Sequence, residues 1–207
     1  MDADAVEIRV LGCLVEKQRT TPDVYPLSLN ALRLACNQST NRDPVVEYDE
    51  ATIRAALDRL SRKGWTRLAS GAGSRAVKYR HLLSEALGLS VPQQALLAVL
   101  MLRGPQTPGE LRQRSERLHS FGSPAELEET LTGLVERGLV TRLARQPGQK
   151  EQRFRQLLGG GEAAPDDATP EREGAQATGP QSDVEARLAA LERRVDALET
   201  RVSGPED

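Results

Sequence analysis

The sequence feature that most constrains the fold is a predicted helix followed by a predicted two-stranded hairpin. Apolar residues recur at helical spacing within 49–62, where Asp49 is suited to cap the helix and Gly64 to end it. Two short segments after the glycine, 65–68 and 76–82, are typical of strands, and a turn rich in glycine and serine joins them. Because two further helices are expected before this unit, its layout is that of a winged helix-turn-helix.

The same unit returns later in the chain. The matching residues lie at an offset of 74 in the helix and 75 in the hairpin: Leu57 with Leu131, Leu60 with Leu134, Gly64 with Gly138, and Lys78-Tyr79-Arg80 with Arg153-Phe154-Arg155. A repeat of this length is the size of a small domain. We therefore expect a mainly α protein with small β wings (α+β), built from two tandem winged helix-turn-helix domains at 1–83 and 84–158.

Residues 159–207 differ in composition from both predicted domains. Glycine, proline, alanine and acidic residues dominate 159–181, which cannot bury a core, so we expect a disordered acidic linker there. Apolar residues then follow a heptad pattern over 182–203 and predict a C-terminal coiled-coil helix, before a short disordered end at 204–207. The seam of this coiled coil consists of Val184, Leu188, Leu191, Val195, Leu198 and Val202.

Charged residues beside this seam predict its geometry. Arginines occupy the g positions and glutamates the e positions, as Arg187 and Glu192 illustrate, so opposite charges meet only if the two helices run parallel. We therefore expect a parallel homodimer. The alternative is an amphipathic helix that docks on its own protein.

The net charge of −2 conceals a division along the chain. Lys and Arg exceed Asp and Glu by three in 1–83 and by two in 84–158, whereas acidic residues exceed basic ones by seven in 159–207. A mildly basic folded part agrees with nucleic-acid binding without requiring it. The chain has no apolar run typical of a signal peptide or a membrane span, so we expect a cytoplasmic protein without membrane association.

Residues suited to catalysis or metal binding are scarce. The histidines, His81 and His119, have no Cys, Asp or Glu at ligand spacing, and no serine lies in a nucleophile elbow. Gly71 and Gly73 join two predicted strands instead of preceding a helix, so they predict a wing tip and not a phosphate cradle. We expect no enzyme, no cofactor and no metal.

Basic residues on the first repeated helix and on both hairpins are candidates for contact with DNA. These candidates are Arg54, Arg59, Arg62, Arg75, Lys78 and Arg80 in the first copy, and Lys150, Arg153 and Arg155 in the second. A solvated basic surface is the alternative for the hairpins. The repeated helix of the second copy carries Glu129 and Glu136, which DNA phosphates would repel, so we expect it to face a partner protein or a second protomer.

A polar loop at 37–44 is richer in side-chain donors than a connector requires. Within it, Asn41 and Arg42 are candidate contacts to a phosphate or to a partner's carboxylate. The alternative is structural, with asparagines that cap helix ends and turn the chain. A later predicted helix carries further basic residues that we expect to form a solvated face: Arg112, Arg114 and Arg117.

Several motifs of this sequence are shared with a known group of proteins: Leu11-Gly12-Cys13-Leu14-Val15-Glu16-Lys17-Gln18, Tyr25-Pro26-Leu27-Ser28, Ala35-Cys36-Asn37-Gln38, Thr40-Asn41-Arg42 and Gln106-Thr107-Pro108-Gly109-Glu110-Leu111-Arg112. Through these motifs, residues 5–157 resemble the YceH family of bacterial proteins. The resemblance implies a tandem winged-helix fold and a cytoplasmic bacterial protein. It implies no reaction.

Two functions of different classes follow from these predictions. The first is a non-catalytic, dimeric regulator of transcription that binds double-stranded DNA. The second is a protein-interaction scaffold whose winged-helix domains bind a partner protein. DNA binding predicts a steep dependence of affinity on salt, whereas scaffolding predicts little response to salt.

Deleting residues 182–207 should lower the dimer fraction, because the deletion removes the predicted coiled-coil seam. The measurement is the mass of the full-length and truncated chains by analytical sedimentation. An unchanged mass would show that the seam does not hold a dimer together.

Overall fold

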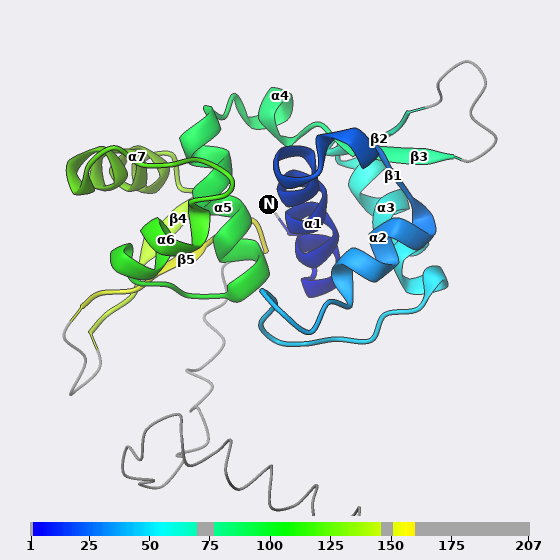
Figure 1. The fold of residues 1–207 in the computed structure, drawn as a ribbon, viewed down its shortest axis with the longest axis horizontal. Coiled ribbons are helices and arrows are strands. Elements are labelled where there is room, and N and C mark those ends of the chain that lie inside the picture. Colours follow the sequence, from blue (N-terminus) through cyan, green and yellow to red (C-terminus); the bar gives the residue numbers. More distant parts are fainter. Residues whose placement is uncertain (1, 70–76, 146–150, 160–207) are drawn as a thin grey trace, which may run out of the picture. The chain divides into compact units, whose positions relative to one another are not determined.

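The computed structural model describes residues 2–69, 77–145 and 151–159. In these ranges, seven α-helices and two small antiparallel sheets form an α+β fold that is consistent with winged-helix architecture (Figure 1). The expected α+β class is therefore confirmed, whereas the tandem domains and the coiled coil stay predictions. The predicted coiled-coil seam and residues 160–181 of the predicted linker lie outside the described residues.

The first half of the fold contains three α-helices and a small sheet. Its elements are α1 (Ala5–Thr20), the 3-10 helix η1 (Pro22–Val24), β1 (Leu27–Ser28), α2 (Leu29–Cys36), α3 (Glu50–Arg62), β2 (Thr66–Ala69) and β3 (Lys78–His81). Strand β3 lies between β1 and β2 in a three-stranded antiparallel sheet. The strands predicted at 65–68 and 76–82 are thus present as β2 and β3, with ends that differ by one or two residues.

The second half repeats this order after a short connecting helix. Its elements are α4 (Leu83–Leu87), α5 (Val91–Arg103), α6 (Pro108–Ser115), α7 (Pro124–Glu136), β4 (Val140–Arg142) and β5 (Phe154–Gln156). Strands β4 and β5 pair antiparallel. All described residues belong to one compact unit, Met1–Glu162, so the division into two separate domains stays a prediction.

The ends of α3 and α7 share one backbone geometry. Gly64 and Gly138 have φ angles of 74° and 65°, a conformation that glycine adopts without steric strain. After α3, the amide of Trp65 donates a hydrogen bond to the carbonyl of Leu60 at 2.9 Å. After α7, the amide of Leu139 donates to the carbonyl of Leu134 at 3.0 Å. The prediction that glycine ends both helices is confirmed.

Polar side chains cap the helices of the second half. At α6, Thr107 and Glu110 form a reciprocal capping box. At α7, Ser123 accepts a hydrogen bond from the amide of Glu126 at 3.2 Å, but the carboxylate of Glu126 accepts from the amide of Gly122 at 2.8 Å. The cap at the start of α7 is therefore not reciprocal, because Glu126 binds Gly122 and not the amide of Ser123.

Helices α1 and α5 lie side by side and join the two halves (Figure 1). Every residue of α1 from 7 to 15 and of α5 from 94 to 102 is buried. This follows because each helix is covered by the other and also by helices of its own half. The two halves consequently share one hydrophobic core.

The N-terminal residues add a second connection between the halves. The amide of Ala3 donates to the carbonyl of Leu158 at 3.1 Å, and Asp2 forms an antiparallel bridge with Gly159. The end of the second half is thus attached to the beginning of the first. Among the described residues, no helix combines the length and the apolar character needed to cross a lipid bilayer.

Gly12 allows α1 to approach α5 closely. A Cβ atom added to Gly12 would lie 3.0 Å from the side chain of Leu102 and 3.1 Å from the Cβ atom of Met101. A methyl group at this position therefore requires the two helices or their side chains to move apart.

Replacing Gly12 with alanine should lower the free energy of unfolding by about 1–2 kcal/mol, because overpacking outweighs the better helix propensity of alanine. Gly133→Ala in α7 is the matched control, since its added Cβ would meet only the flexible end of Gln93 at 3.6 Å. We expect that control to be neutral or to stabilise by up to about 1 kcal/mol. Denaturant unfolding measures both, and a Gly12→Ala protein as stable as Gly133→Ala would contradict the packing argument.

Candidate functional site

Two of the predicted DNA contacts project from α3 into solvent. Arg54 and Arg62 are exposed, and neither pairs with any other residue in the described part of the chain. Helical spacing places them on one face of α3 with Ala51, Ala55 and Asp58, which are also exposed. This face therefore combines two free guanidinium groups with small side chains and one carboxylate.

Arg59 and Arg80, by contrast, have acidic partners within the chain. The Nη2 atom of Arg59 lies 2.6 Å from the carboxylate of Asp4, and its Nε atom lies 3.8 Å from that of Glu7. The Nη2 atom of Arg80 lies 2.7 Å from the carboxylate of Glu85. These pairs reduce the positive charge that Arg59 and Arg80 offer to a phosphate.

The first hairpin keeps basic side chains without such partners. Arg67 on β2 is exposed and Lys78 on β3 is half-buried, and no described residue forms an ion pair with either. Tyr79, between Lys78 and Arg80, packs against the hydrophobic core. Side chains alternate along a strand, so Lys78 and Arg80 lie on the side opposite the tyrosine.

The remaining hairpin candidates are placed differently. Arg75 and Lys150 lie outside the described residues. Arg153 donates to the carbonyl of Pro105 at 3.2 Å, and Arg155 is half-buried. The second hairpin therefore offers less free positive charge than the first in the residues that are described.

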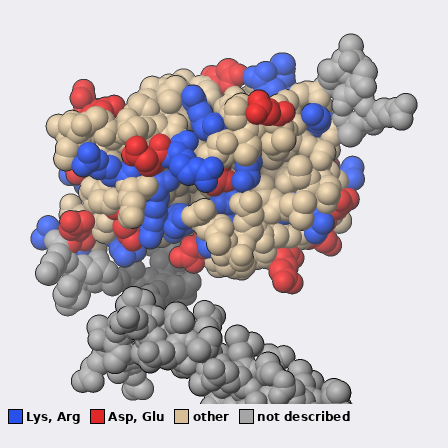
Figure 2. All heavy atoms as spheres, in the orientation of Figure 1, with Lys and Arg blue, Asp and Glu red and all other residues tan. Residues whose placement is uncertain are grey.

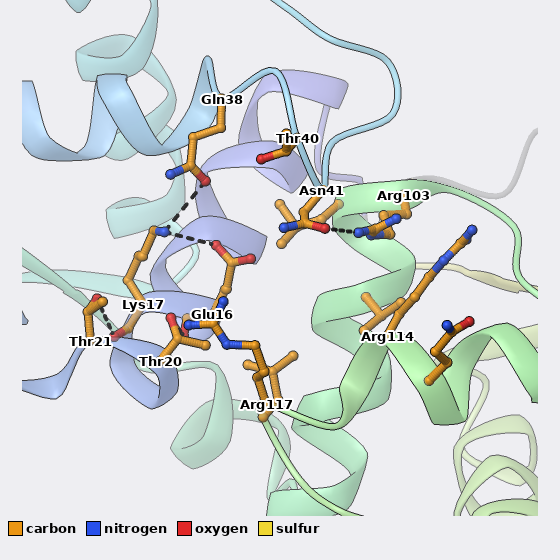
Figure 3. A pocket seen from close by; sticks show the side chains of 14 residues that line it. Glu16, Lys17, Thr20, Thr21, Gln38, Thr40, Asn41, Arg103, Arg114 and Arg117 are labelled. Atoms are coloured by element: carbon orange, nitrogen blue, oxygen red, sulfur yellow. Dashed lines mark hydrogen bonds and ion pairs between the residues drawn. The ribbon is translucent and has the colours of Figure 1, made fainter. Parts of the chain in front are cut away.

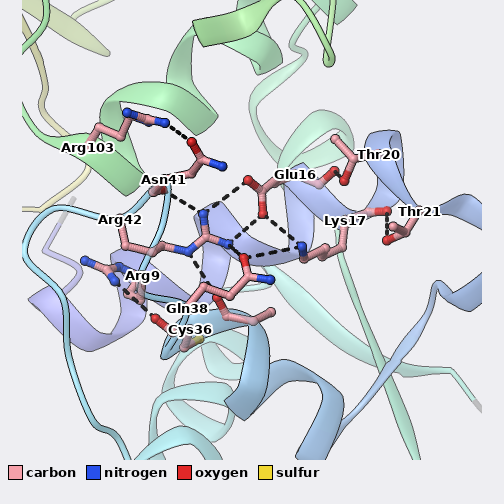
Figure 4. A network of polar contacts seen from close by, with 11 residues as sticks. Arg9, Glu16, Lys17, Thr20, Thr21, Cys36, Gln38, Asn41, Arg42 and Arg103 are labelled. Atoms are coloured by element: carbon pink, nitrogen blue, oxygen red, sulfur yellow. Dashed lines mark hydrogen bonds and ion pairs between the residues drawn. The ribbon is translucent and has the colours of Figure 1, made fainter. Parts of the chain in front are cut away.

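The connection between α2 and α3 is built around the guanidinium of Arg42, which is fully buried (Figure 4). Its Nη2 and Nη1 atoms donate to the two carboxylate oxygens of Glu16 at 2.6 and 3.1 Å. Its Nε atom donates to the carbonyl of Ala35 at 3.0 Å, and Nη2 also donates to Gln38 at 2.8 Å. Burial alone would lower the pKa of Arg42, but hydrogen bonding to Glu16 raises this pKa above its usual value.

Arg42 is consequently not available as the phosphate or partner contact that the sequence suggested. The carboxylate that it binds through two parallel hydrogen bonds belongs to Glu16 of the same chain. Its donors are directed instead at acceptors from α1, α2 and the loop itself.

Further hydrogen bonds fix the two ends of the same loop. The side-chain amide of Asn37 donates to the carbonyl of Tyr48 at 2.8 Å, and the backbone amide of Tyr48 donates back to Asn37 at 2.9 Å. Arg9 of α1, which is also buried, donates to the carbonyls of Cys36 at 3.1 Å and Pro44 at 2.6 Å. The loop is therefore held on α1 along most of its length.

The middle of the loop reaches α5 in the second half. Asn41 has a φ of 60°, and its side-chain oxygen accepts a hydrogen bond from the Nη2 atom of Arg103. The amide of Asp43 donates to the carbonyl of Leu102 at 2.9 Å. Asn41 is exposed, but its described contact is with its own chain, so the loop connects the two halves.

A cleft of about 600 Å³ opens where this loop meets α1, α5 and the end of α6 (Figure 3). Hydroxyl and amide groups form much of its wall, and they come from Thr20, Thr21, Gln38, Thr40 and Gln113. Apolar side chains contribute at three positions: Val99, Leu102 and Leu118. The cleft is therefore a polar site between the two halves.

Basic side chains dominate the charge of this cleft. Its described lining contains one acidic residue, Glu16, and four basic residues: Lys17, Arg103, Arg114 and Arg117. Lys and Arg side chains gather in the middle of the face shown in Figure 2, over the junction of the two halves. The cleft consequently carries an excess of positive charge.

The basic residues of the cleft differ in how far they are neutralised. Lys17 lies 3.5 Å from Glu16, and Arg114 lies 3.3 Å from Glu110. Arg117 is exposed and pairs with none of the described residues. Burial, together with the positive charges of Arg114 and Arg42, lowers the pKa of the Arg103 guanidinium.

Sequence reasoning did not identify this cleft. It assigned Arg112, Arg114 and Arg117 to a solvated face. Arg112 and Arg117 are indeed exposed and Arg114 is half-buried, but Arg114 and Arg117 also line the cleft. The spacing of Arg114 and Arg117 was an available signal, because residues three apart near one helix share a side. No comparable signal connects them with Lys17, which lies far earlier in the chain.

The histidines have structural contacts. His81 is buried at the end of β3, and burial lowers its pKa to about 4. His119 lies 3.2 Å from the carboxylate of Glu126 and packs edge-on against Phe121. Within the ranges that the structure describes, no group of three or more His, Cys, Asp or Glu residues is arranged to hold a metal ion.

Replacing Arg42 with methionine should lower the free energy of unfolding by about 3–5 kcal/mol, because the largely buried Glu16 then loses its partner. Arg33→Met is the control, since the guanidinium of Arg33 makes only an exposed hydrogen bond to Asn30 at 3.1 Å. We expect that control to change stability by no more than about 0.5 kcal/mol. Urea unfolding of both variants tests the difference, and equal stabilities would refute the role assigned to Arg42.

Comparison with known proteins relates the chain to a bacterial family. A family model described as "Protein of unknown function, DUF480" matches residues 3–149. The UPF0502 protein of Pelobacter propionicus is 52% identical over 205 residues, which cover 95% of this chain and 90% of the relative. The UPF0502 protein of Pectobacterium carotovorum is 46% identical over 207 residues, which cover 94% of this chain and 97% of the relative. The resemblance recognised from the motifs is thereby confirmed, and the chain belongs to the DUF480 family of bacterial proteins.

Proposed function

We propose that this protein is a non-catalytic, DNA-binding regulator of transcription in the bacterial cytoplasm. The observation that carries the proposal is the outward face of α3, where Arg54 and Arg62 are exposed and free of partners among the described residues. Ala51 and Ala55 on this face are small enough to let the helix come close to a DNA groove. In winged-helix architecture this helix is the one that reads the groove, by analogy with other helix-turn-helix proteins.

The first hairpin extends this surface. Arg67 and Lys78 have no described acidic partner, so both can contact backbone phosphates. Such contacts position a protein on DNA without reading its sequence. The proposed DNA surface therefore consists of Arg54 and Arg62 on α3 with Arg67 and Lys78 on the hairpin.

The described residues of the second half do not offer an equivalent surface. The exposed side of α7 carries Glu128, Glu129 and Glu136, which would meet DNA phosphates with like charge. The proposal accordingly assigns DNA contact to the first half. A parallel homodimer held by the predicted coiled coil would present two copies of this surface to one duplex.

Full-length protein should bind labelled random duplex DNA with roughly micromolar affinity at low salt, and the affinity should fall steeply as salt rises. Arg54→Glu with Arg62→Glu should weaken binding at least about tenfold and reduce the salt slope by about two, because two phosphate contacts are lost. Fluorescence anisotropy across a salt series measures both quantities.

The matched control is Arg112→Glu with Arg145→Glu, which changes the net charge equally but lies in the second half and outside the cleft lining. Under the proposal this control binds DNA with a salt slope close to that of the unmodified protein. The DNA-binding function is rejected if the unmodified protein does not bind at low salt. It is also rejected if both double variants lose affinity to the same extent.

A protein-interaction scaffold is the second candidate function, and one groove favours it. This groove of about 530 Å³ lies between α7 and the start of α5, and its charged lining residues are Glu129 and Glu136. An acidic groove of this kind suits a basic segment of a partner protein. Under this function, charge reversal at Arg54 and Arg62 leaves partner binding unchanged.

A further inference from the structure

The geometry points to a binding site for a small phosphorylated ligand in the cleft between α1, α5 and α6. This site lies apart from the proposed DNA surface on α3, and it does not depend on DNA binding. Its ligand class is a polyanion that carries at least two negative charges on phosphate groups.

The balance of charge in the cleft is the first support for this inference. Among the described residues, four cations line it, of which Arg114 also pairs with Glu110 outside the lining. The single described lining carboxylate, Glu16, already accepts two hydrogen bonds from the buried Arg42. Glu16 therefore contributes little negative charge to the cleft itself. Like charges that line one cleft repel one another, as Arg114 does Arg103, and a bound anion would relieve the repulsion.

The fixed position of the cations is the second support. Arg103 is held by its hydrogen bond to Asn41, and Arg114 is held by Gln106 and Glu110. Lys17 lies between Glu16 and Gln38, 3.5 Å from each (Figure 3). Cations that are ordered before the ligand arrives lose little conformational freedom on binding.

Arg117 has a different role in the site. It is the exposed cation of the lining and has no partner in the described ranges, so its guanidinium is free to close on an anion. Planar guanidinium groups bind phosphate through two parallel hydrogen bonds. Arg117 is therefore the residue whose loss removes ligand contact without removing a described contact of the fold.

The size and the walls of the cleft restrict the ligand further. A volume of about 600 Å³ is typical of sites for small molecules. Threonine hydroxyls and glutamine amides offer hydrogen bonds to phosphate oxygens, while Val99, Leu102 and Leu118 leave room for a small apolar part. A diphosphate ester fits this combination better than an uncharged or purely apolar compound.

The test measures binding of sodium pyrophosphate to the full-length protein by titration calorimetry at constant ionic strength. We expect saturable binding with one site per chain and a higher unfolding temperature in its presence. Arg117→Glu should weaken binding at least tenfold. Arg112→Glu, which changes the same charge on an exposed residue outside the lining, should leave it unchanged.

Three results would overturn the inference. The first is a binding heat for pyrophosphate that does not saturate, or an equal heat when sodium chloride of the same ionic strength is titrated instead. The second is equal binding by the Arg117→Glu and Arg112→Glu proteins. The third is displacement of pyrophosphate by a short DNA duplex, which would assign the phosphate site to DNA instead of to a small ligand.

Discussion

The buried ion pair between Arg42 and Glu16 determines the path of the chain between α2 and α3. A buried guanidinium is costly unless acceptors satisfy its donors, and here they come from α1, from the end of α2 and from the loop. This requirement leaves the loop few alternative conformations. The loop places Asn41 against Arg103 and thereby forms one wall of the cleft.

The connection between α2 and α3 is also longer than a helix-turn-helix needs. Such turns usually have about three or four residues, whereas here residues 37–49 separate the two helices. The added length reaches the second half, where Asp43 binds the backbone of Leu102. The segment 37–49 therefore does more than connect α2 to α3. It also joins the two halves on the side of the cleft.

Local signals allowed much of the fold to be predicted from the sequence. The positive φ of Gly64 and Gly138 and the capping box at Thr107 depend on residues within one turn of the chain, so the pattern alone identifies them. The role of Arg42 could not be recognised in this way, because its burial depends on Glu16 of a different helix. The shared burial of α1 and α5 likewise depends on packing between segments that are far apart in the sequence.

The same distinction applies to the charged residues. Arg54 and Arg59 are equivalent in the sequence, yet only Arg59 meets the carboxylates of Asp4 and Glu7. The cleft combines residues of α1 with residues near the end of α6, so no single stretch of sequence contains its pattern. The sequence shows where basic and acidic residues lie along the chain, but only the tertiary structure shows which of them form ion pairs.

The contact between α1 and α5 has a consequence for synthesis on the ribosome. The face of α1 that contains Gly12 is covered by α5, and Ala3 pairs with Leu158 near the end of the same unit. While the first half emerges alone, that apolar face of α1 has no covering helix and faces water. The N-terminal half therefore completes its core only after α5 has been translated, and its last backbone pairings wait for residues 158 and 159.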